Sequence, residues 1–496
     1  RVYSGTDINT LNLKKVCLYI DQLDSHYPLL TVNQTLDFAF EAAGGKNYLV
    51  LKESQVEKFT NVVNHERSNS QAILQGTRKI LVKMLGLSNA QNTISGDEIF
   101  RGLSGGEKKR LTIGEKLFMR QPVMLCDEIT TGLDSTTAQN IVQYICQSTK
   151  TMLTTPVLSL LQPSPEIVKL FDEILVLCEG RIIFQGPESD VLEYFESIGY
   201  IAQASVPIAE FLVNMATPSR SHYKNGSSAP ATARDLAEAW MDSEYSLAKR
   251  KQTQEALNIR SVQAAENIYY LKKTPEFVRS WFSDMFVVLN RQFLLLWTEK
   301  LRWLLLLGNL MITVLITGAL FYDLPLSGES ITDTTWFAAR VAAGFFAVIV
   351  FALNSFISIP VFFEQRGIFY KQRDASFHRT ATFVLASTLS SWWPKLFESF
   401  LAVTVTVFMT NLVDTDASDF VPVLITYVMY GFASNLLFGA TMALVAFSTR
   451  TMVECFLTSC FVLITLMCFS GFLITFDNIQ DHFIWLYWLD PVGTYN

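Results

Sequence analysis

Charged residues are scarce in this chain of 496 residues, because Asp, Glu, Lys and Arg make up only 17% of it, against about 25% in an average soluble domain. The net charge of −7 supplies no overall positive field, which excludes nucleic-acid binding driven by electrostatics. The 7 cysteines form no C-x-x-C pair, so neither a zinc site nor a disulfide scaffold is indicated. Half of the residues are apolar, which excludes a disordered chain.

The scarcity of charge is concentrated in the second part of the chain. Of the 39 Lys and Arg residues, 7 lie in residues 303–496, and of the 46 Asp and Glu residues, 13 lie there. Five mainly apolar stretches in this part are long enough, as helices, to cross about 30 Å of hydrocarbon. We therefore predict an all-α polytopic transmembrane domain over residues 301–496, in contact with the lipid bilayer. The predicted spans are 303–322, 341–363, 380–412, 420–449 and 455–476.

The connecting segments alternate in charge, which predicts the orientation of the spans. Basic residues gather before the first span (Arg291, Lys300 and Arg302) and again in the segment 364–379, whereas the segment after the third span is acidic. Because Lys and Arg are retained on the cytoplasmic side, residues 1–302 are predicted to be cytosolic. An amphipathic helix at 278–300 is expected to lie at the membrane surface before the first span.

Polar residues also occur inside the predicted spans. Lys395 and Glu398 are three residues apart on one helical face, and we expect a local ion pair, with a role in transport as the alternative. Asn354 and Asn435 are expected to form hydrogen bonds between helices.

The soluble part contains the segment Arg101-Gly-Leu-Ser-Gly-Gly-Glu-Lys-Lys-Arg-Leu111. Ser104 and Glu107 have the spacing of a capping box, which predicts the start of a helix. Gly105 and Gly106 place no side chains over its exposed N–H groups, so the helix start could meet a phosphate.

A second candidate site lies about twenty residues further on. Residues 120–128 form an apolar run that ends in Asp127 and Glu128, as a buried strand does when it delivers acids to the carboxyl edge of a sheet. Asp127 suits Mg²⁺, which accepts one or two carboxylates together with phosphate oxygens. Glu128 could polarise an attacking water.

The order of these motifs resembles the ATPase domain of ABC transporters. Gln22, then Leu103-Ser-Gly-Gly-Glu107, then Asp127-Glu128, then Thr131-Gly-Leu-Asp134-Ser135 are similar to the Q-loop, signature, Walker B and D-loop. Further similarity, including Val361-Phe-Phe-Glu-Gln-Arg366, covers nearly all of the chain. The chain resembles the N-terminal half of a full-size, G-subfamily pleiotropic drug resistance exporter of the plant type.

The resemblance implies a role for each matching residue. Gln22 would sense Mg²⁺ and the attacking water, Asp127 would hold Mg²⁺, and Glu128 would be the general base. Asp134 would bridge across a dimer of nucleotide-binding domains, and Ser104, Gly105, Gly106 and Glu107 would cap ATP held by the opposite half. The implied cofactors are ATP and Mg²⁺.

Two departures from the family pattern affect these expectations. The printed sequence contains no G-x-x-x-x-G-K-[ST] phosphate loop, and its nearest string, Gly44-Gly-Lys46-Asn47, follows Gln22 instead of preceding it. We expect the loop upstream of Arg1 and a sixth span beyond Asn496. In addition, Leu161 stands where the family has a switch His, and it cannot hydrogen-bond a γ-phosphate.

The predicted fold is thus a partial α/β P-loop-type ABC ATPase domain at 1–217, a linker at 218–277, the amphipathic helix, and an ABC2-type membrane domain. The predicted function is ATP-driven export of hydrophobic or amphipathic molecules (drugs, lipids or secondary metabolites), with a second half as partner, in the plasma membrane. The alternatives are a non-catalytic membrane scaffold or channel, and a soluble ABC ATPase of the DNA-repair or ribosome type, which the predicted spans disfavour.

Overall fold

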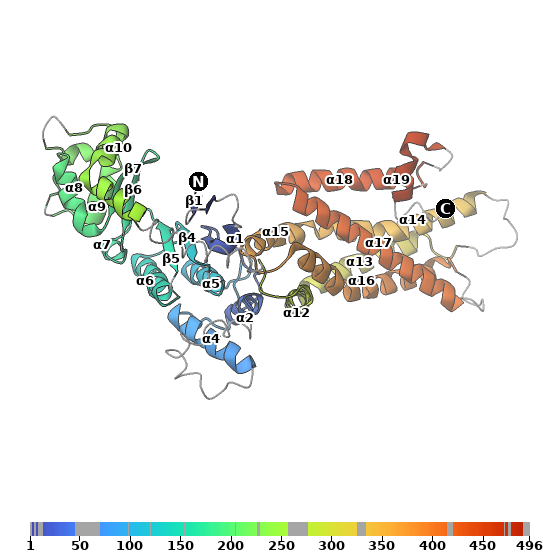
Figure 1. Cartoon of the computed structure of the whole chain (residues 1–496). Helices are drawn as coiled ribbons and strands as arrows, with labels where there is room; N and C mark the ends of the chain where they lie inside the picture. The colour runs from blue at the N-terminus through green and yellow to red at the C-terminus, as the bar shows by residue number, and fades with distance from the viewer. Residues whose placement is uncertain are drawn as a thin grey trace. The chain divides into compact units, whose positions relative to one another are not determined.

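The computed structural model describes most of the chain, in two compact units (Figure 1). The first unit comprises Arg1–Ser280 with Asp374–Phe377, and the second comprises Trp281–Arg373 with His378–Asn496. The described residues are 2–3, 6–7, 13–44, 70–97, 99–119, 121–152, 154–203, 205–225, 229–255, 276–324, 334–413, 420–470, 472–474 and 478–489.

A parallel sheet of three strands organises the first part of the first unit. Its strands are β3 (Cys17–Ile20), β4 (Val123–Asp127) and β5 (Thr155–Ser159), in the order β3-β4-β5. Tyr19 pairs with Leu125, and Asp127 pairs with Ser159. Because all three strands run in the same direction, their carboxyl ends meet at one edge, where the polar residues predicted at the end of β4 lie.

The remaining elements of this part are mostly helices. Each of α2 and α5 begins with a capping box, as the sequence predicts at Ser104. The bounds are β1 (Val2–Tyr3), β2 (Thr6–Asp7), α1 (Leu13–Val16), α2 (Val32–Ala42), α4 (Ser70–Met84), α5 (Gly105–Leu117), α6 (Ser135–Met152) and α7 (Pro165–Val168).

A hairpin and several short helices form a separate aromatic core. The strands β6 (Ile174–Cys178) and β7 (Arg181–Gly186) are antiparallel. The ring centroids of Phe184 and Tyr194 lie 5.5 and 5.1 Å from that of Trp240 on α10 (Ala233–Asp242). The other elements are η3 (Glu188–Asp190), α8 (Val191–Ser197), α9 (Ile208–Met215) and η4 (Pro218–Tyr223).

The linker predicted at 218–277 is wrong in its first part. Tyr223, Leu236 and Trp240 are 9%, 0% and 6% exposed and belong to this aromatic core. The apolar face of α10 repeats every three to four residues among polar ones, so its average composition conceals an amphipathic helix. Residues 226–228 and 256–275 of the predicted linker lie outside the described residues.

The second unit is a bundle of long helices. Four of the described helical segments are long and apolar enough to cross a membrane: Lys300–Leu320, Ala338–Ile357, Phe420–Ser448 and Met452–Phe469. The bounds of the elements are α12 (Trp281–Thr298), α13 (Lys300–Leu320), α14 (Thr334–Ile357), α15 (Ile359–Asp374), α16 (Thr380–Thr410), α17 (Phe420–Ser448), α18 (Met452–Phe469), η6 (Asp481–Phe483) and α19 (Ile484–Leu489).

These helices differ from the predicted spans at several of their ends. The second span was predicted to reach residue 363, but α14 ends at Ile357 and a separate helix, α15, begins at Ile359. The segment 364–379, predicted to be a loop, is largely helical because α15 continues to Asp374. The last span was predicted to reach residue 476, but α18 ends at Phe469. A fifth long helix, α16, coincides with the predicted span 380–412, but it is not among the four apolar segments and it contains Pro394.

The outward-facing side chains of the bundle are strongly apolar. On α18, Val453, Leu457, Phe461 and Ile464 follow one another at helical spacing and are each at least 60% exposed. In water such a stripe would be unfavourable, because each large apolar side chain is stabilised by leaving water. The stripe therefore fits a surface in contact with lipid.

The helix α12 has its polar residues inside and its aromatic residues outside. Asp284 and Arg291 are 2% and 4% exposed, whereas Phe282 and Trp297 are 68% and 72% exposed. The Asp284 Oδ2 atom accepts hydrogen bonds from the Arg379 backbone N–H (3.0 Å) and the Thr382 hydroxyl (2.8 Å). Arg291 Nη1 donates to Gln372 Oε1 (2.5 Å). The stretch 278–300, where an amphipathic helix is predicted, contains α12 with its aromatic face turned away from the bundle. Its location at the membrane surface remains a prediction.

The turn between α15 and α16 holds a fully buried histidine. The His378 ring lies 5.8 Å from the ring of Phe369 and 5.3 Å from that of Phe383. Burial, reinforced by the positive charge of Arg291, lowers the pKa of His378 to about 3. The imidazole is therefore neutral in the folded unit at ordinary pH.

We expect His378→Phe to weaken the pH dependence of stability. Below a pH of about 6.5 the unfolded chain binds a proton that the folded chain excludes, so this group lowers the free energy of unfolding by up to about 2 kcal/mol between pH 7 and pH 5. The measurement is the thermal unfolding midpoint of the protein in detergent at both pH values, with the exposed His482→Phe as control. An identical loss in wild type and His378→Phe would contradict the prediction.

Candidate nucleotide-hydrolysis site

The predicted acidic residues lie together at the carboxyl edge of the parallel sheet. Asp127 is the last residue of β4, and Glu128 follows it directly. Gln22 comes two residues after the end of the neighbouring strand, β3. Gln22, which is 106 residues from Glu128 in the sequence, is thus brought to the edge that carries Asp127 and Glu128.

Asp127 is held by hydrogen bonds from both flanking strands. The Ser159 hydroxyl donates to Asp127 Oδ1 (2.7 Å), and the Tyr19 hydroxyl donates to Oδ2 (2.7 Å). Both hydrogen bonds hold the pKa of Asp127 below its usual range, and the bond from Ser159 has the larger effect. The hydrogen bond between Tyr19 and Asp127 also raises the pKa of Tyr19 to about 12. Asp127 is therefore an ionised carboxylate with a fixed orientation.

Glu128 occupies an unusual backbone conformation beside it. Its φ of 45° lies in the left-handed region, which a residue with a side chain adopts only when the surroundings enforce it. Its N–H donates to the backbone oxygen (3.2 Å) and the hydroxyl (3.0 Å) of Ser159. Its Oε2 atom accepts a hydrogen bond from Gln22 Nε2 (3.1 Å). The turn thus directs the Glu128 carboxylate toward Gln22.

The predicted signature residues begin α5. Ser104 Oγ accepts from the Glu107 N–H (3.4 Å), and Glu107 Oε2 accepts from the Ser104 N–H (2.9 Å), which is a complete capping box. Glu107 is therefore engaged in the cap. Gly105 has open space where a side chain would stand, whereas a Cβ on Gly106 would come within 3.2 Å of Thr137 Cγ2.

Asp134 and Leu161 complete the predicted residues. Asp134 Oδ2 accepts from the Thr137 N–H (2.9 Å) just before α6, and hydrogen bonding with Thr137 lowers the pKa of Asp134. The bridge that Asp134 is predicted to make across a dimer remains a prediction. Leu161 follows β5, and its side chain is 63% exposed. A leucine here offers no hydrogen bond to a ligand at this edge.

Sequence reasoning missed a polar stripe on α5 that holds the segment around Gln22. Lys109 Nζ donates to the Gln22 backbone oxygen (2.7 Å) and forms an ion pair with Asp24 Oδ2 (3.2 Å). The Thr112 hydroxyl donates to Asp24 Oδ1 (2.6 Å), and Lys116 Nζ donates to the Tyr19 backbone oxygen (3.0 Å). The spacing of Lys109, Thr112 and Lys116 places them on one helical face, which was the available signal.

The edge fits a magnesium ion that is shared with phosphate. Among the described residues, no group of three or more His, Cys, Asp and Glu is placed to hold a metal by itself. Mg²⁺ needs only one or two carboxylates and takes its other ligands from water and phosphate. The ionised and half-buried Asp127 supplies such a carboxylate.

Two family models match the chain, one in each unit. Residues 2–131 match the model described as ABC transporter, and residues 283–495 match the model described as ABC-2 type transporter. An ATPase domain followed by a helical membrane domain defines an ABC transporter, and the chain belongs to that family. It is accordingly an integral membrane protein, and the predicted fold class is confirmed.

Among ABC transporters, the chain is similar to the G family and the pleiotropic drug resistance proteins. It is 29% identical to ABC transporter G family member 32 of Arabidopsis thaliana and 28% identical to pleiotropic drug resistance protein 1 of Nicotiana tabacum. It is also 29% identical to ABC transporter G family member 35 of Oryza sativa subsp. japonica. Each match covers 99% of this chain and 35%, 34% and 34% of the relatives, respectively, so the chain spans about a third of their length.

We expect Lys109→Met to loosen the segment around Gln22. The change leaves the Asp24 carboxylate without its ammonium partner in a poorly hydrated place, which costs about 3 kcal/mol of local stability. Hydrogen exchange of residues 19–26, measured by mass spectrometry, should become faster by about a hundredfold. Lys79→Met, at an exposed position of α4, is the matched control and should leave exchange in residues 19–26 unchanged.

Proposed function

We propose that the chain is the ATP-hydrolysing half of an exporter that moves hydrophobic or amphipathic small molecules across the plasma membrane. The observation that carries the proposal is the hydrogen bond between Gln22 and Glu128 beside an ionised Asp127, at the edge of a parallel sheet. The apolar, outward-facing surface of the second unit supports a location in a membrane.

The residues at the edge divide the work of hydrolysis between them. Bound Mg²⁺ and ATP would supply the phosphoanhydride bond to be broken and the cation that balances its charge. Asp127 would hold the cation, Glu128 would accept a proton from the attacking water, and Gln22 would orient that water through its amide. Ser159 and Tyr19 keep the Asp127 carboxylate ionised and fixed.

The start of α5 supports a second half as the partner of this chain. A Cβ on Gly105 would meet no atom within 4 Å, so the start of α5 is open at this residue, and the dipole of a helix N-terminus favours an anion. Such a surface suits the phosphates of ATP held by the opposite half. A preference of ATP for the closed pair would then shift the membrane helices between two arrangements.

We infer that this site hydrolyses ATP slowly, because Leu161 offers no hydrogen bond at the γ-phosphate. The same residue favours the alternative function, a non-catalytic membrane scaffold or channel. The two functions differ in whether Glu128 matters for turnover. The fixed pairing of Glu128 with Gln22 supports the catalytic one.

Replacing Glu128 tests the proposal directly. In the full-length protein, single-turnover hydrolysis should resolve one kinetic phase for each ATP site. Glu128→Gln removes the proton acceptor, so the phase of this site should slow by about a hundredfold or more, with ATP binding retained. Glu179→Gln is the matched control, since Glu179 also has a positive φ (48°) but lies in the β6–β7 turn. Unchanged phases in Glu128→Gln would refute the role of Glu128 and favour the scaffold.

Replacing Leu161 tests the inferred slowness. Leu161→His adds an imidazole at an exposed position, at little cost in packing, and should speed the slow phase by about tenfold, because a hydrogen-bond donor would now face the γ-phosphate. Leu161→Gln, which is polar but lacks the imidazole, serves as comparison. A slow phase that stays unchanged in Leu161→His would show that another feature limits this site.

A further inference from the structure

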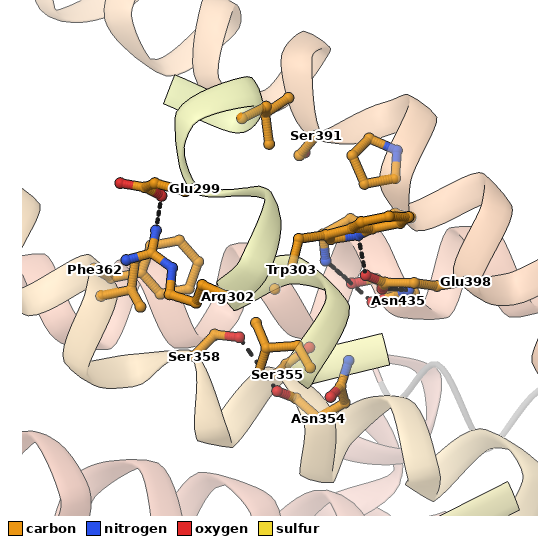
Figure 2. Close-up of a pocket in the computed structure, with 16 residues that line it drawn as sticks. Glu299, Arg302, Trp303, Asn354, Ser355, Ser358, Phe362, Ser391, Glu398 and Asn435 are labelled. Carbon is orange, nitrogen blue, oxygen red and sulfur yellow. Dashed lines mark hydrogen bonds and ion pairs between the residues drawn. The ribbon is translucent and has the colours of Figure 1, made fainter. Parts of the chain in front are cut away.

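The second unit contains a partly open cavity of about 180 Å³ that hydrolysis does not use (Figure 2). It is lined by side chains at α12, α13, α14, α15, α16 and α17. Much of its wall is apolar, formed by Trp303, Leu306, Phe362 and Pro394 among others. A cavity of about 150 Å³ is enough to hold a benzene ring, so this one accommodates a ring with a small substituent.

The charged side chains at the cavity already have partners. Lys395 Nζ donates to the backbone oxygen (2.6 Å) and Oδ1 (3.1 Å) of Asn435, whose Nδ2 donates to Glu398 Oε2 (3.1 Å). Figure 2 shows Trp303 and Asn435 directed at Glu398, where Trp303 Nε1 donates to Oε1 (3.1 Å). The expected direct ion pair of Lys395 and Glu398 is therefore replaced by a bridge through Asn435, which confirms the expected hydrogen bonding of Asn435 between helices.

The remaining charges at the cavity also cancel. Arg302 forms an ion pair with Glu299, so two positive and two negative groups line the cavity. Gly439 leaves room for the Lys395 ammonium, because a Cβ there would overlap Lys395 Nζ. The cavity thus offers no unpaired ion, and a charged ligand would have to break an existing pair.

Asn354 is the exception to this pairing. It lines the cavity, it is only 6% exposed, and its Oδ1 atom has no hydrogen-bond partner among the described residues. The expected hydrogen bonding of Asn354 Oδ1 between helices is therefore not found. This oxygen is covered by protein, so a ligand in the cavity reaches it after the amide has turned. Because a buried polar atom without a partner is unfavourable, a ligand that pairs with the turned amide gains affinity. A hydroxyl suits it best, because it both donates and accepts and can meet either end of the amide.

We propose that this cavity binds the hydroxyl-bearing end of a neutral amphipathic molecule, with a single ring against the apolar wall and the hydroxyl on Asn354. The inference deepens the proposed export function and rests on it for the placement of the cavity in a membrane. It names the class of molecule that one half can hold within its own helices.

Photolabelling of the full-length, nucleotide-free protein in lipid nanodiscs tests the site. The probe is benzyl alcohol that carries a diazirine, and the matched probe has a methyl group in place of the hydroxyl. The hydroxylated probe should label peptides of α13, α14 and α16 at the cavity, and excess benzyl alcohol should protect them better than toluene does. Equal labelling by both probes, or labelling only elsewhere, would overturn the proposal.

Two variants assign the hydroxyl preference to Asn354. Asn354→Leu should raise the benzyl alcohol concentration needed for protection by about fivefold, the effect of one lost hydrogen bond, and leave protection by toluene unchanged. Asn309→Leu, at an exposed position of α13, is the matched control. Ser391→Leu narrows the cavity from a partly exposed position and should reduce labelling by both probes, so it decides the matter if Asn354→Leu does not fold. A hydroxyl preference that survives in a folded Asn354→Leu, or full labelling of a folded Ser391→Leu, would overturn the proposal.

The readouts separate this proposal from the proposed function. Labelling needs no ATP turnover, and ATP-driven transport into inverted vesicles needs no occupied cavity. Labelling without transport would overturn the export function and leave the cavity as a binding site. Transport without hydroxyl-dependent labelling would leave export intact and remove the binding site.

Discussion

The pairing of polar groups that leave water governs both units of this chain. In the first unit, the backbone groups of three parallel strands satisfy one another, and the side chains that remain at their carboxyl edge bond among themselves. In the second unit, Asn435 gives its oxygen to Lys395 and its nitrogen to Glu398, which allows both ions to lie among helices. Where such pairing is complete, the structure has one arrangement available. At Asn354, where it is incomplete beside a cavity, a ligand is proposed to complete it.

The same principle connects the two ends of the ATPase site. Lysine side chains on the polar face of α5 donate hydrogen bonds to the backbone oxygens of Tyr19 and Gln22, and the start of the same helix carries the Ser104 cap. A rigid helix of 13 residues therefore lies between the Gln22 segment and the surface proposed to meet the opposite half. A displacement at one end of α5 should therefore also move the other end, since the contacts of Lys109 and Thr112 between the two ends are buried.

Local signals in the sequence predicted much of the fold and of the site. The capping box at Ser104, the strand that ends in Asp127 and the position of α12 all follow from residues close together in the chain. Tyr19 and Ser159 could not be predicted as partners of Asp127, because their approach depends on the strand order β3-β4-β5. The break between α14 and α15 at Ser358 was missed because the apolar composition of α14 continues past the break as far as Phe363. The packed segment around Trp240 was missed because its neighbours are small and polar.

The arrangement of α12 has a consequence for how such chains can be divided and recombined. Its inward face supplies Asp284 to the start of α16 and Arg291 to α15, so these contacts belong to the membrane unit although the helix precedes the first span. A membrane fragment begun at Lys300 would lose both partners. It would leave the Gln372 oxygen on α15 without its donor, and the donors at the start of α16 without their acceptor. The natural point of exchange between one ATPase domain and another therefore lies before Trp281, within the segment where the two compact units meet in sequence.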